Sequence, residues 1–308
     1  MKILNYGSLN IDQVYRVPRI VRPGETLSSR SLKTFAGGKG ANQSMALARA
    51  GASVWHAGKV GDDGAWLTEK LQKAGVETHW IRKGDTPTGN AIIQVDDAGQ
   101  NAIFLFPGGN REIDRDEVDE TLESFGSGDW ILLQNEINLI PFIILAACDK
   151  DMKVCLNPAP FGEEVLKYPL GSVDMLVLNE TEGEGLTGES NPESILQMAR
   201  AKASKAEIVL TLGEKGAMVM EGSEITTVPG KTVKALDTTA AGDTFIGYYL
   251  ARRSEGLEVR DSLEQACAAA ALSVTRSGAQ DSIPKRAEVK NYLAGNEPDQ
   301  ESDQPDLV

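Results

Sequence analysis

The feature that most constrains the fold of this chain is an alternation of short apolar runs with longer segments of helical periodicity. The apolar runs have the length of buried strands, and they lie at 3–6, 53–59, 130–133, 154–156, 175–178 and 208–212. Helical patterns lie between them, near 41–50, 65–74, 114–124, 139–149 and 192–206. This order predicts an α/β fold in which helices cover both faces of a mostly parallel sheet.

Two segments, 12–35 and 88–107, interrupt this order with strand-like runs and no helix between them. Residues 96–99 read Asp-Asp-Ala-Gly, a hairpin-type turn between two of those runs. Such hairpins either extend the main sheet or form a separate one. We favour a small β-sheet lid, because both insertions flank glycine-rich polar segments. The predicted division is a lid formed by 12–35 and 88–107, and an α/β/α domain formed by 1–11, 36–87 and 108–294.

Composition excludes several classes of function. The formal net charge of −14 disfavours nucleic acid as a partner, since an acidic chain repels a phosphate backbone. Cys148, Cys155 and Cys267 are too few and too scattered for a disulfide framework or a zinc site. Neither a signal peptide nor a membrane-spanning apolar run is evident, so we expect a cytoplasmic protein. Residues 295–308, rich in Asp, Glu, Gln and Pro, predict a disordered acidic tail.

The run 237–243 reads Asp-Thr-Thr-Ala-Ala-Gly-Asp and precedes an apolar helical stretch at 246–251. Its small residues let backbone N–H groups approach an anion, and a helix that begins here adds unpaired donors and a favourable dipole. This arrangement suits a phosphoryl group in transfer. Asp243 could instead be a simple N-cap, although a cap does not require the compact polar run before it.

The run 35–43 reads Phe-Ala-Gly-Gly-Lys-Gly-Ala-Asn-Gln and leads into an Ala-rich helix. It is not a Walker phosphate loop, because Lys33 stands where the first glycine belongs and Gly40 follows Lys39. A plain glycine turn is the other interpretation. Lys39 and Asn42 favour a site, since both offer hydrogen bonds beside a backbone that can approach a polyol.

Three weaker signals follow other strands. Asn10 and Asp12, at i and i+2, point the same way if the strand continues, although such residues are usually turn formers. Residues 179–182 read Asn-Glu-Thr-Glu after a strand, where α/β ligands bind, and Glu182 could organise water around Mg²⁺. A helix-start acidic cluster is the alternative. The Gly-Glu-Lys-Gly turn at 213–216 could contact a nucleotide.

Taken in order, these segments resemble the ribokinase family of carbohydrate and nucleoside kinases. The runs 37–43 and 237–243 resemble the two signatures of that family. The runs 157–160 (Asn-Pro-Ala-Pro), 179–182 and 274–280 (Val-Thr-Arg-Ser-Gly-Ala-Gln) fit as well. The resemblance covers roughly residues 2–293 and implies a three-layer, Rossmann-like α/β/α domain with a small β-sheet lid.

The resemblance also implies roles for individual residues. Asp243 would deprotonate the sugar hydroxyl, and the backbone of Ala240, Ala241 and Gly242 would form the anion hole. The implied sugar-binding residues are Asn10, Asp12, Gly38, Lys39, Asn42, Glu136 and Asp243. The implied nucleotide-binding residues are Asn179, Thr211, Gly213, Glu214, Gly216, Gly242 and Cys267. Glu182 would lie near Mg²⁺, and the positions matching a K⁺ site are Asp237, Thr239, Ser273, Arg276, Gly278 and Ser282.

The implied reaction is phosphorylation of a primary hydroxyl of a small sugar by ATP, with D-ribose giving ribose 5-phosphate. The alternatives are another pentose, ketose or polyol, or a non-catalytic sugar or nucleotide sensor on the same fold. Cys267 replaces a histidine that is frequent near the adenine in this family, and Asn90, Phe104 and Phe106 are unexpected in a ribose pocket. A homodimer through the lid is also implied.

Overall fold

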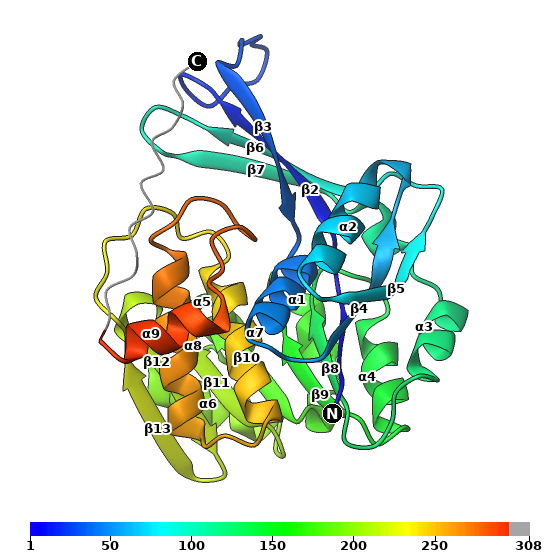
Figure 1. Ribbon diagram of the computed structural model, residues 1–308, viewed down its shortest axis with the longest axis vertical. Coiled ribbons are helices and arrows are strands. Elements are labelled where there is room, and N and C mark those ends of the chain that lie inside the picture. Colours follow the sequence, from blue (N-terminus) through cyan, green and yellow to red (C-terminus); the bar gives the residue numbers. More distant parts are fainter. Residues whose placement is uncertain (296–308) are drawn as a thin grey trace.

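The centre of the molecule is a nine-stranded sheet, seen in a computed structural model that describes residues 1–295 (Figure 1). Strands from β11 to β5 run parallel to their neighbours, whereas β12 and β13 are antiparallel additions at one edge. The predicted mostly parallel sheet is therefore confirmed. In spatial order the strands are β13 (Glu224–Pro229), β12 (Gly216–Glu221), β11 (Glu207–Thr211), β10 (Met175–Asn179), β9 (Lys153–Asn157), β8 (Trp130–Gln134), β1 (Ile3–Tyr6), β4 (Val54–Val60) and β5 (Glu77–Lys83).

Helices cover both faces of this large sheet, because its inner strands are apolar on both sides. In β8 the side chain of Leu132 packs into one core and that of Ile131 into the other. The helices that pack into the core of Leu132 are α1 (Lys39–Arg49), α2 (Ala65–Lys73), α7 (Ala241–Ser254), α8 (Val259–Ser273) and α9 (Arg286–Leu293). Those that pack into the core of Ile131 are α3 (Arg115–Leu122), α4 (Ile140–Cys148), α5 (Glu180–Thr187) and α6 (Pro192–Lys202).

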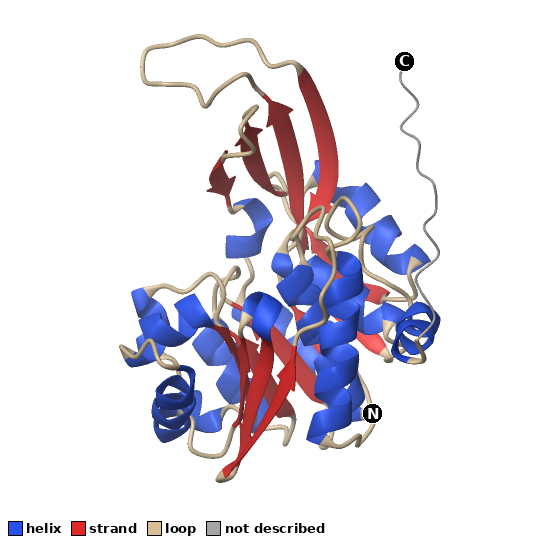
Figure 2. Cartoon of the chain, turned by 90° about the vertical axis from the view of Figure 1, so that its left-hand side faces the viewer, coloured by secondary structure: helices blue, strands red, loops and turns tan. Residues whose placement is uncertain are grey.

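A second, four-stranded sheet contains the helix-free segments (Figure 2). The hairpin turn predicted at 96–99 is present, with the Asp96 N–H donating to the Gln100 carbonyl at 3.0 Å. The outer strand β7 is mostly exposed, and Phe104 retains 60% of its surface. The strands of this small sheet, in order, are β3 (Ser31–Gly37), β2 (Asn10–Arg16), β6 (Gly89–Val95) and β7 (Asn101–Phe106). The separate small β-sheet that we favoured is confirmed.

Some elements were not predicted. The residues of the edge strand β5 are exposed or half-buried, and none is fully buried. Its sequence therefore lacks the apolar run that marks the inner strands. Strands β12 and β13 form a hairpin, and the outer strand β13 is mostly exposed. It therefore lacks the continuous apolar run that would predict a buried strand. The helix expected at 192–206 ends at Lys202, because Ala203 leaves helical dihedral angles.

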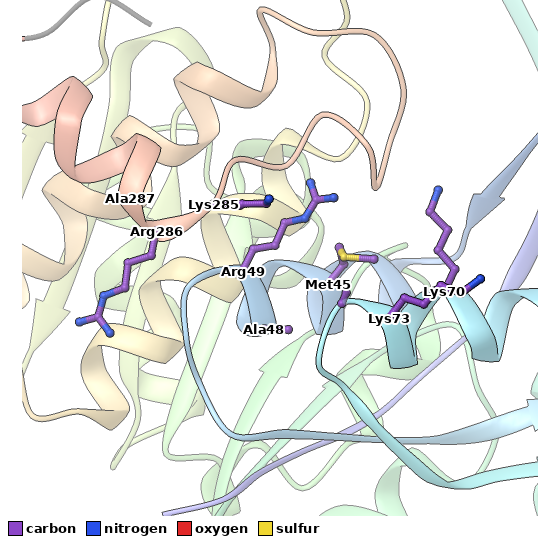
Figure 3. Close-up of a pocket in the computed structure, with 9 residues that line it drawn as sticks. Met45, Ala48, Arg49, Lys70, Lys73, Lys285, Arg286 and Ala287 are labelled. Carbon is purple, nitrogen blue, oxygen red and sulfur yellow. The ribbon is translucent and has the colours of Figure 1, made fainter. Parts of the chain in front are cut away.

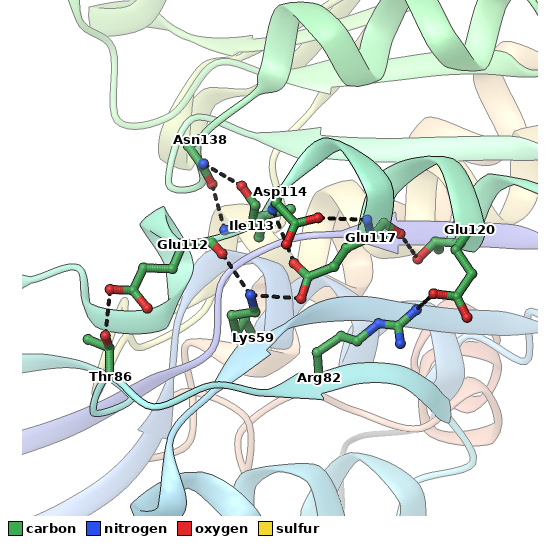
Figure 4. Close-up of polar contacts among 10 residues, drawn as sticks. Lys59, Arg82, Thr86, Glu112, Ile113, Asp114, Glu117, Glu120 and Asn138 are labelled. Carbon is green, nitrogen blue, oxygen red and sulfur yellow. Dashed lines mark hydrogen bonds and ion pairs between the residues drawn. The ribbon is translucent and has the colours of Figure 1, made fainter.

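The junction between the two sheets is held by a polar cluster around Lys59, at the end of β4 (Figure 4). The Lys59 ammonium lies 2.7 Å from the Glu117 carboxylate and donates to the Glu112 carbonyl at 2.7 Å. The Asn138 side chain both donates to and accepts from the backbone of Ile113. These contacts fix the segment that follows β7 against the large sheet.

The predicted acidic tail lies, from residue 296 onward, outside the described residues. None of the helices in residues 1–295 is both long and apolar enough to cross a bilayer.

Candidate active site

A cavity of about 250 Å³ opens where the carboxyl ends of β9, β10 and β11 meet the starts of α1 and α7. This is the edge at which open α/β sheets bind ligands. Its lining contains eight of the predicted site residues, which are Lys39, Asn179, Glu182, Thr211, Ala240, Ala241, Gly242 and Asp243.

The amino end of α7 presents its backbone to this cavity. Ala240 precedes the helix with a φ of 59°, a left-handed conformation that is uncommon for a residue with a side chain. The first N–H groups of a helix have no acceptor within it, so those of Gly242 and Asp243 can face an anion, whereas the Ala241 N–H donates to the Thr238 carbonyl at 3.3 Å. Asp243 is the third helical residue, so the alternative that it caps the helix is wrong.

The Asp243 carboxylate is buried and held by two amides from α1. Asn42 Nδ2 donates to Oδ2 at 3.0 Å, and Gln43 Nε2 donates to Oδ1 at 2.9 Å. Asp243 itself is only 7% exposed. Both carboxylate oxygens thus have a fixed direction while the group still borders the cavity.

Lys39 is the first residue of α1 and carries the positive charge of the site. The charge of Asp243, followed by those of Glu136 and Glu182, raises the pKa of Lys39 against the opposing effect of burial. Its side chain therefore remains an ammonium among three carboxylates. Its backbone N–H also donates to Glu136 Oε2 at 3.0 Å, which ties the predicted sugar ligand Glu136 to the start of the helix.

Gly38 makes this helix start possible. Its φ is 89°, and a Cβ here would lie 2.9 Å from both the Asn10 nitrogen and the Ser8 carbonyl oxygen. A side chain at this position would therefore have a strained backbone conformation and would also clash with the backbone of neighbouring residues.

On the sugar side, Asn10 and Asp12 lie at alternate positions of β2. Asn110 Nδ2 donates to Asn10 Oδ1 at 2.8 Å. Burial, and then the charge of Glu136, raises the pKa of Asp12 to about 7. A Cβ at Gly37 would lie 2.0 Å from the Asp12 carboxylate, so the glycine leaves the space that this group occupies.

The predicted nucleotide-binding residues are more widely spread. Asn179 and Thr211 border the cavity, whereas Gly213 and Glu214 are exposed in the turn just beyond β11. Gly216 opens β12 with a φ of 106°. Cys267 is buried within α8 and is not among the described residues that line the cavity.

Glu182 has a structural role as well as the one predicted for it. Asn179 and Glu182 form a capping box at the start of α5, which bears out the alternative of an acidic helix start. Within residues 1–295, no three His, Cys, Asp or Glu side chains cluster as a metal cage would require. One buried carboxylate that borders the cavity nevertheless fits Mg²⁺, which keeps several waters and takes its other ligands from substrate phosphates.

Of the positions predicted around K⁺, hydrogen bonds join Asp237 to Thr239 and to Gly278, which lies in a second segment. Asp237 accepts hydrogen bonds from the N–H of Thr239 at 2.9 Å and from the N–H of Gly278 at 3.0 Å. Burial acts to raise the pKa of Asp237, but hydrogen bonds from the Thr239 hydroxyl, the Thr239 N–H and the Gly278 N–H outweigh it and lower the pKa. The hydroxyls of Ser273 and Ser282 donate to carbonyls within their own segments. Carboxylate, hydroxyl and carbonyl oxygens are a donor set that fits an alkali cation. The Arg276 guanidinium pairs with Glu288, which leaves only the backbone carbonyl of this residue for a cation.

A larger cavity, of about 530 Å³, lies between α1, α2 and the start of α9 (Figure 3). It contains none of the predicted site residues and no carboxylate or amide side chain in its lining. A base is needed to deprotonate a hydroxyl, so we place the chemistry in the smaller cavity. The basic side chains of the larger one are Arg49, Lys70, Lys73, Lys285 and Arg286.

Sequence reasoning assigned no role to several polar residues that the fold brings to this site. Gln43 contacts Asp243, and Asn157 contacts both Gln43 and Glu182. Asn110 contacts Asn10 and the Leu9 backbone. The sequence signal that could have indicated Gln43 was a glutamine inside an otherwise Ala-rich helix.

The comparisons with known proteins agree with this geometry. Residues 1–286 match the model of the pfkB family carbohydrate kinases. A ribokinase of Haemophilus influenzae is 37% identical over 299 residues, covering 93% of this chain and 96% of its own. A deoxyribokinase of Salmonella typhi is 33% identical, covering 96% of this chain and all of its own. The Arabidopsis thaliana ribokinase, solved with ribose and ATP, superimposes with a TM-score of 0.83 at 31% identity, over 94% of this chain and 98% of that one. The chain belongs to the pfkB family of carbohydrate kinases.

Proposed function

We propose that this kinase transfers the γ-phosphoryl group of ATP to the primary hydroxyl of D-ribose, giving ribose 5-phosphate. The observation that carries the proposal is the Asp243 carboxylate, buried at the amino end of α7 and oriented by Asn42 and Gln43. Ribokinases among the relatives support the choice of sugar.

In this mechanism Asp243 accepts the proton of the sugar hydroxyl as the oxygen attacks the γ-phosphorus. The N–H group of Gly242 would meet the charge that develops on the transferring phosphoryl oxygens, and that of Ala241 would join it by leaving the Thr238 carbonyl. The charge of Asp243 is the largest influence on the pKa of Lys39, so the Lys39 ammonium lies near the base and adds positive charge at the same point. Most of the rate enhancement comes from positioning and charge, since phosphoryl transfer needs little covalent chemistry from the protein.

The sugar would lie between β2 and α1. The polar groups that a polyol requires come from β2, from the start of α1 and from the Glu136 side chain that accepts from the Lys39 N–H. The residues are Asn10, Asp12, Gly38, Asn42 and Glu136. ATP would extend from the amino end of α7 past Asn179 and Thr211 towards Gly213 and Glu214. The other residues of the nucleotide site would be Gly216, Gly242 and Cys267.

Two cations belong to this proposal. Mg²⁺, held through Glu182 and substrate phosphates, would neutralise phosphate charge. K⁺ would be held by oxygens of the two segments joined by Asp237 and Gly278, beside the start of α7.

The small sheet would act as the lid and as a dimer interface. Its outer strand exposes Ile103, Phe104 and Leu105, at 57%, 60% and 49% of their surfaces. Such an apolar patch on an unpaired edge strand favours a second copy of the chain as its partner. We place the reaction in the cytoplasm, supported by three free cysteines in a chain without disulfides among residues 1–295.

The test is ADP release by the purified protein with ATP, Mg²⁺ and K⁺, across ribose, deoxyribose, fructose, adenosine and no sugar. Turnover with ribose that is lost in Asp243→Asn and reduced without K⁺ would support the proposal. Turnover with deoxyribose instead of ribose would keep the mechanism and change the substrate. The deoxyribokinase among the relatives makes deoxyribose the specific alternative to test. ATP binding without turnover of any sugar would favour a sensor.

A further inference from the structure

Gln43 is the most deeply buried polar side chain in contact with the base. It is fully buried in α1, and it is not among the described residues that line the cavity. Its Nε2 nevertheless donates to Asp243 Oδ1 at 2.9 Å and to Asn157 Oδ1 at 3.2 Å. One carboxamide thus joins α7, where the base lies, to the end of β9.

The contact continues from Asn157 to the predicted magnesium ligand. Asn157 Nδ2 donates to Glu182 Oε2 at 3.3 Å and to the Val177 carbonyl at 3.1 Å. Asp243 and Glu182 are therefore linked through two buried amides that do not depend on any ligand. We call Gln43 and Asn157 the amide pair.

A further amide fixes which way Gln43 points. Gln134 Nε2 donates to Gln43 Oε1 at 2.7 Å and to Asn5 Oδ1 at 2.9 Å. An amide nitrogen carries two hydrogens, and each NH₂ group of Gln134, Gln43 and Asn157 has two acceptors. Rotating Gln43 by 180° would place its oxygen against the Asp243 carboxylate and lose every one of its hydrogen bonds.

The far end of this chain of amides carries no charge. Asn5 Nδ2 donates to Ser44 Oγ at 2.8 Å, and Ser44 Oγ lies 2.8 Å from His56 Nδ1. Complete burial lowers the pKa of His56 to about 4, so its imidazole is neutral at pH 7. The charged groups around Asp243 are accordingly Lys39 from α1 and Glu182 from α5, with Glu136 next to Lys39.

We propose that Gln43 is a positioning residue for the base, and that the amide pair sets the direction of the Asp243 carboxylate relative to Glu182. This inference rests on the proposed function. Because Gln43 donates to Asp243 Oδ1, it fixes the direction of that oxygen, which leaves Oδ2 and its remaining lone pair for the sugar hydroxyl. A carboxylate free to rotate would spend less time in line with that hydroxyl.

The experiment compares Gln43→Leu, Gln43→Glu and the matched control Ser44→Ala in the full chain. Ser44 follows Gln43 in α1 and is equally buried, but its hydroxyl contacts Asn5 and His56 instead of Asp243. For Gln43→Leu we expect kcat to fall about 10–100-fold with the KM values for sugar and ATP within about threefold. Ser44→Ala should keep kcat within about threefold of the original protein.

Gln43→Glu supplies a second readout, the kcat–pH profile, which would not change if Gln43 had only a structural role. It puts a second carboxylate beside Asp243, and adjacent carboxylates disfavour each other's ionisation. We expect the acidic limb of its kcat–pH profile to move up by about one pH unit or more. Gln43→Leu should not reproduce that size of shift, because it adds no charge. Melting temperatures of all three variants identify any variant that has lost its fold.

The inference is overturned if Gln43→Leu, folded, keeps kcat within threefold, or if Ser44→Ala loses as much kcat as Gln43→Leu. An unchanged pH profile in a folded, active Gln43→Glu also contradicts it. A wild-type chain without turnover of any sugar removes the proposed function itself, a result distinct from all of these.

Discussion

Asn42 and Asp243, 201 positions apart in the chain, meet with Asn42 Nδ2 at 3.0 Å from Asp243 Oδ2. The other end of the same amide, Asn42 Oδ1, is buried and accepts no hydrogen bond from any described residue. A buried acceptor without a partner is costly, and such groups are concentrated where a ligand completes the site. In the proposed function, Asn42 therefore orients the base with one atom and would offer the other to the sugar.

This relationship predicts the effect of Asn42→Leu. The variant loses the bond to Asp243 and the acceptor for a sugar hydroxyl, so kcat should fall and the KM for ribose should rise about tenfold, the worth of roughly one hydrogen bond. The KM for ATP should stay within about twofold. Steady-state kinetics in each substrate separate these quantities, and an unchanged ribose KM would exclude Asn42 from the sugar site.

Replacing the base should leave ATP binding intact. Asp243→Asn keeps the shape of the side chain but removes the proton acceptor, and we expect kcat to fall about 10²–10⁴-fold. ATP affinity, measured by calorimetry, should change little because the N–H groups of α7 remain. A variant that retains a tenth or more of the original kcat would show that another group accepts the proton.

Asp12 predicts a dependence of stability on pH. Its pKa is raised from 3.8 to about 7 by burial and by Glu136, so the folded chain holds a proton that the unfolded chain releases. The stability from this group is complete below about pH 4 and is lost as the pH rises towards 7. Asp12→Asn should therefore be more stable than the original chain at pH 8.

The measurement is chemical denaturation between pH 5 and pH 8. The difference in unfolding free energy between Asp12→Asn and the original chain should grow in favour of the variant as the pH rises. The KM for ribose should rise in the same variant, because a carboxylate that accepts hydroxyl hydrogen bonds is gone. A difference that stays constant with pH would contradict the raised pKa.

Gly40 predicts a backbone effect at the start of α1. A Cβ at this position would lie 2.4 Å from the Ser8 nitrogen and 2.5 Å from the Gly7 carbonyl carbon, both backbone atoms that cannot rotate away. We expect Gly40→Ala to destabilise the fold by about 2 kcal/mol or more. Gly126→Ala is the control, since no described atom lies within 4 Å of its added Cβ. Equal losses in denaturation experiments would refute the steric argument.

The exposed strand β7 of the small sheet leads us to predict that the chain forms a homodimer. If β7 forms the dimer interface, Phe104→Glu places a charge in an apolar contact and should shift the chain to monomers in sedimentation velocity. Phe104 is 60% exposed in the single chain, so the monomer fold should tolerate the change, and its melting temperature at low protein concentration should be little altered. A persistent dimer would place the interface elsewhere.

Local patterns were sufficient to predict the sheet and most of its helices. The inner strands β1, β8 and β10 are continuous apolar runs, and burial on both faces permits little else. The run 237–243 likewise indicated an anion site, because small residues before an apolar helix leave its first N–H groups open to an anion. The edge strand β5 was missed, since half-buried residues carry no such signal.

The sequence by itself determined the fold class and the family and supplied most of the candidate site residues, because backbone preference, burial pattern and motif spacing are local properties. Only the tertiary structure decided how those residues act on one another. Asp243 and Gln43 are 200 positions apart, and their contact depends on α1 and α7 packing on the same face of the sheet. The direction of each amide depends in turn on hydrogen bonds from other elements, and no local pattern encodes such a choice.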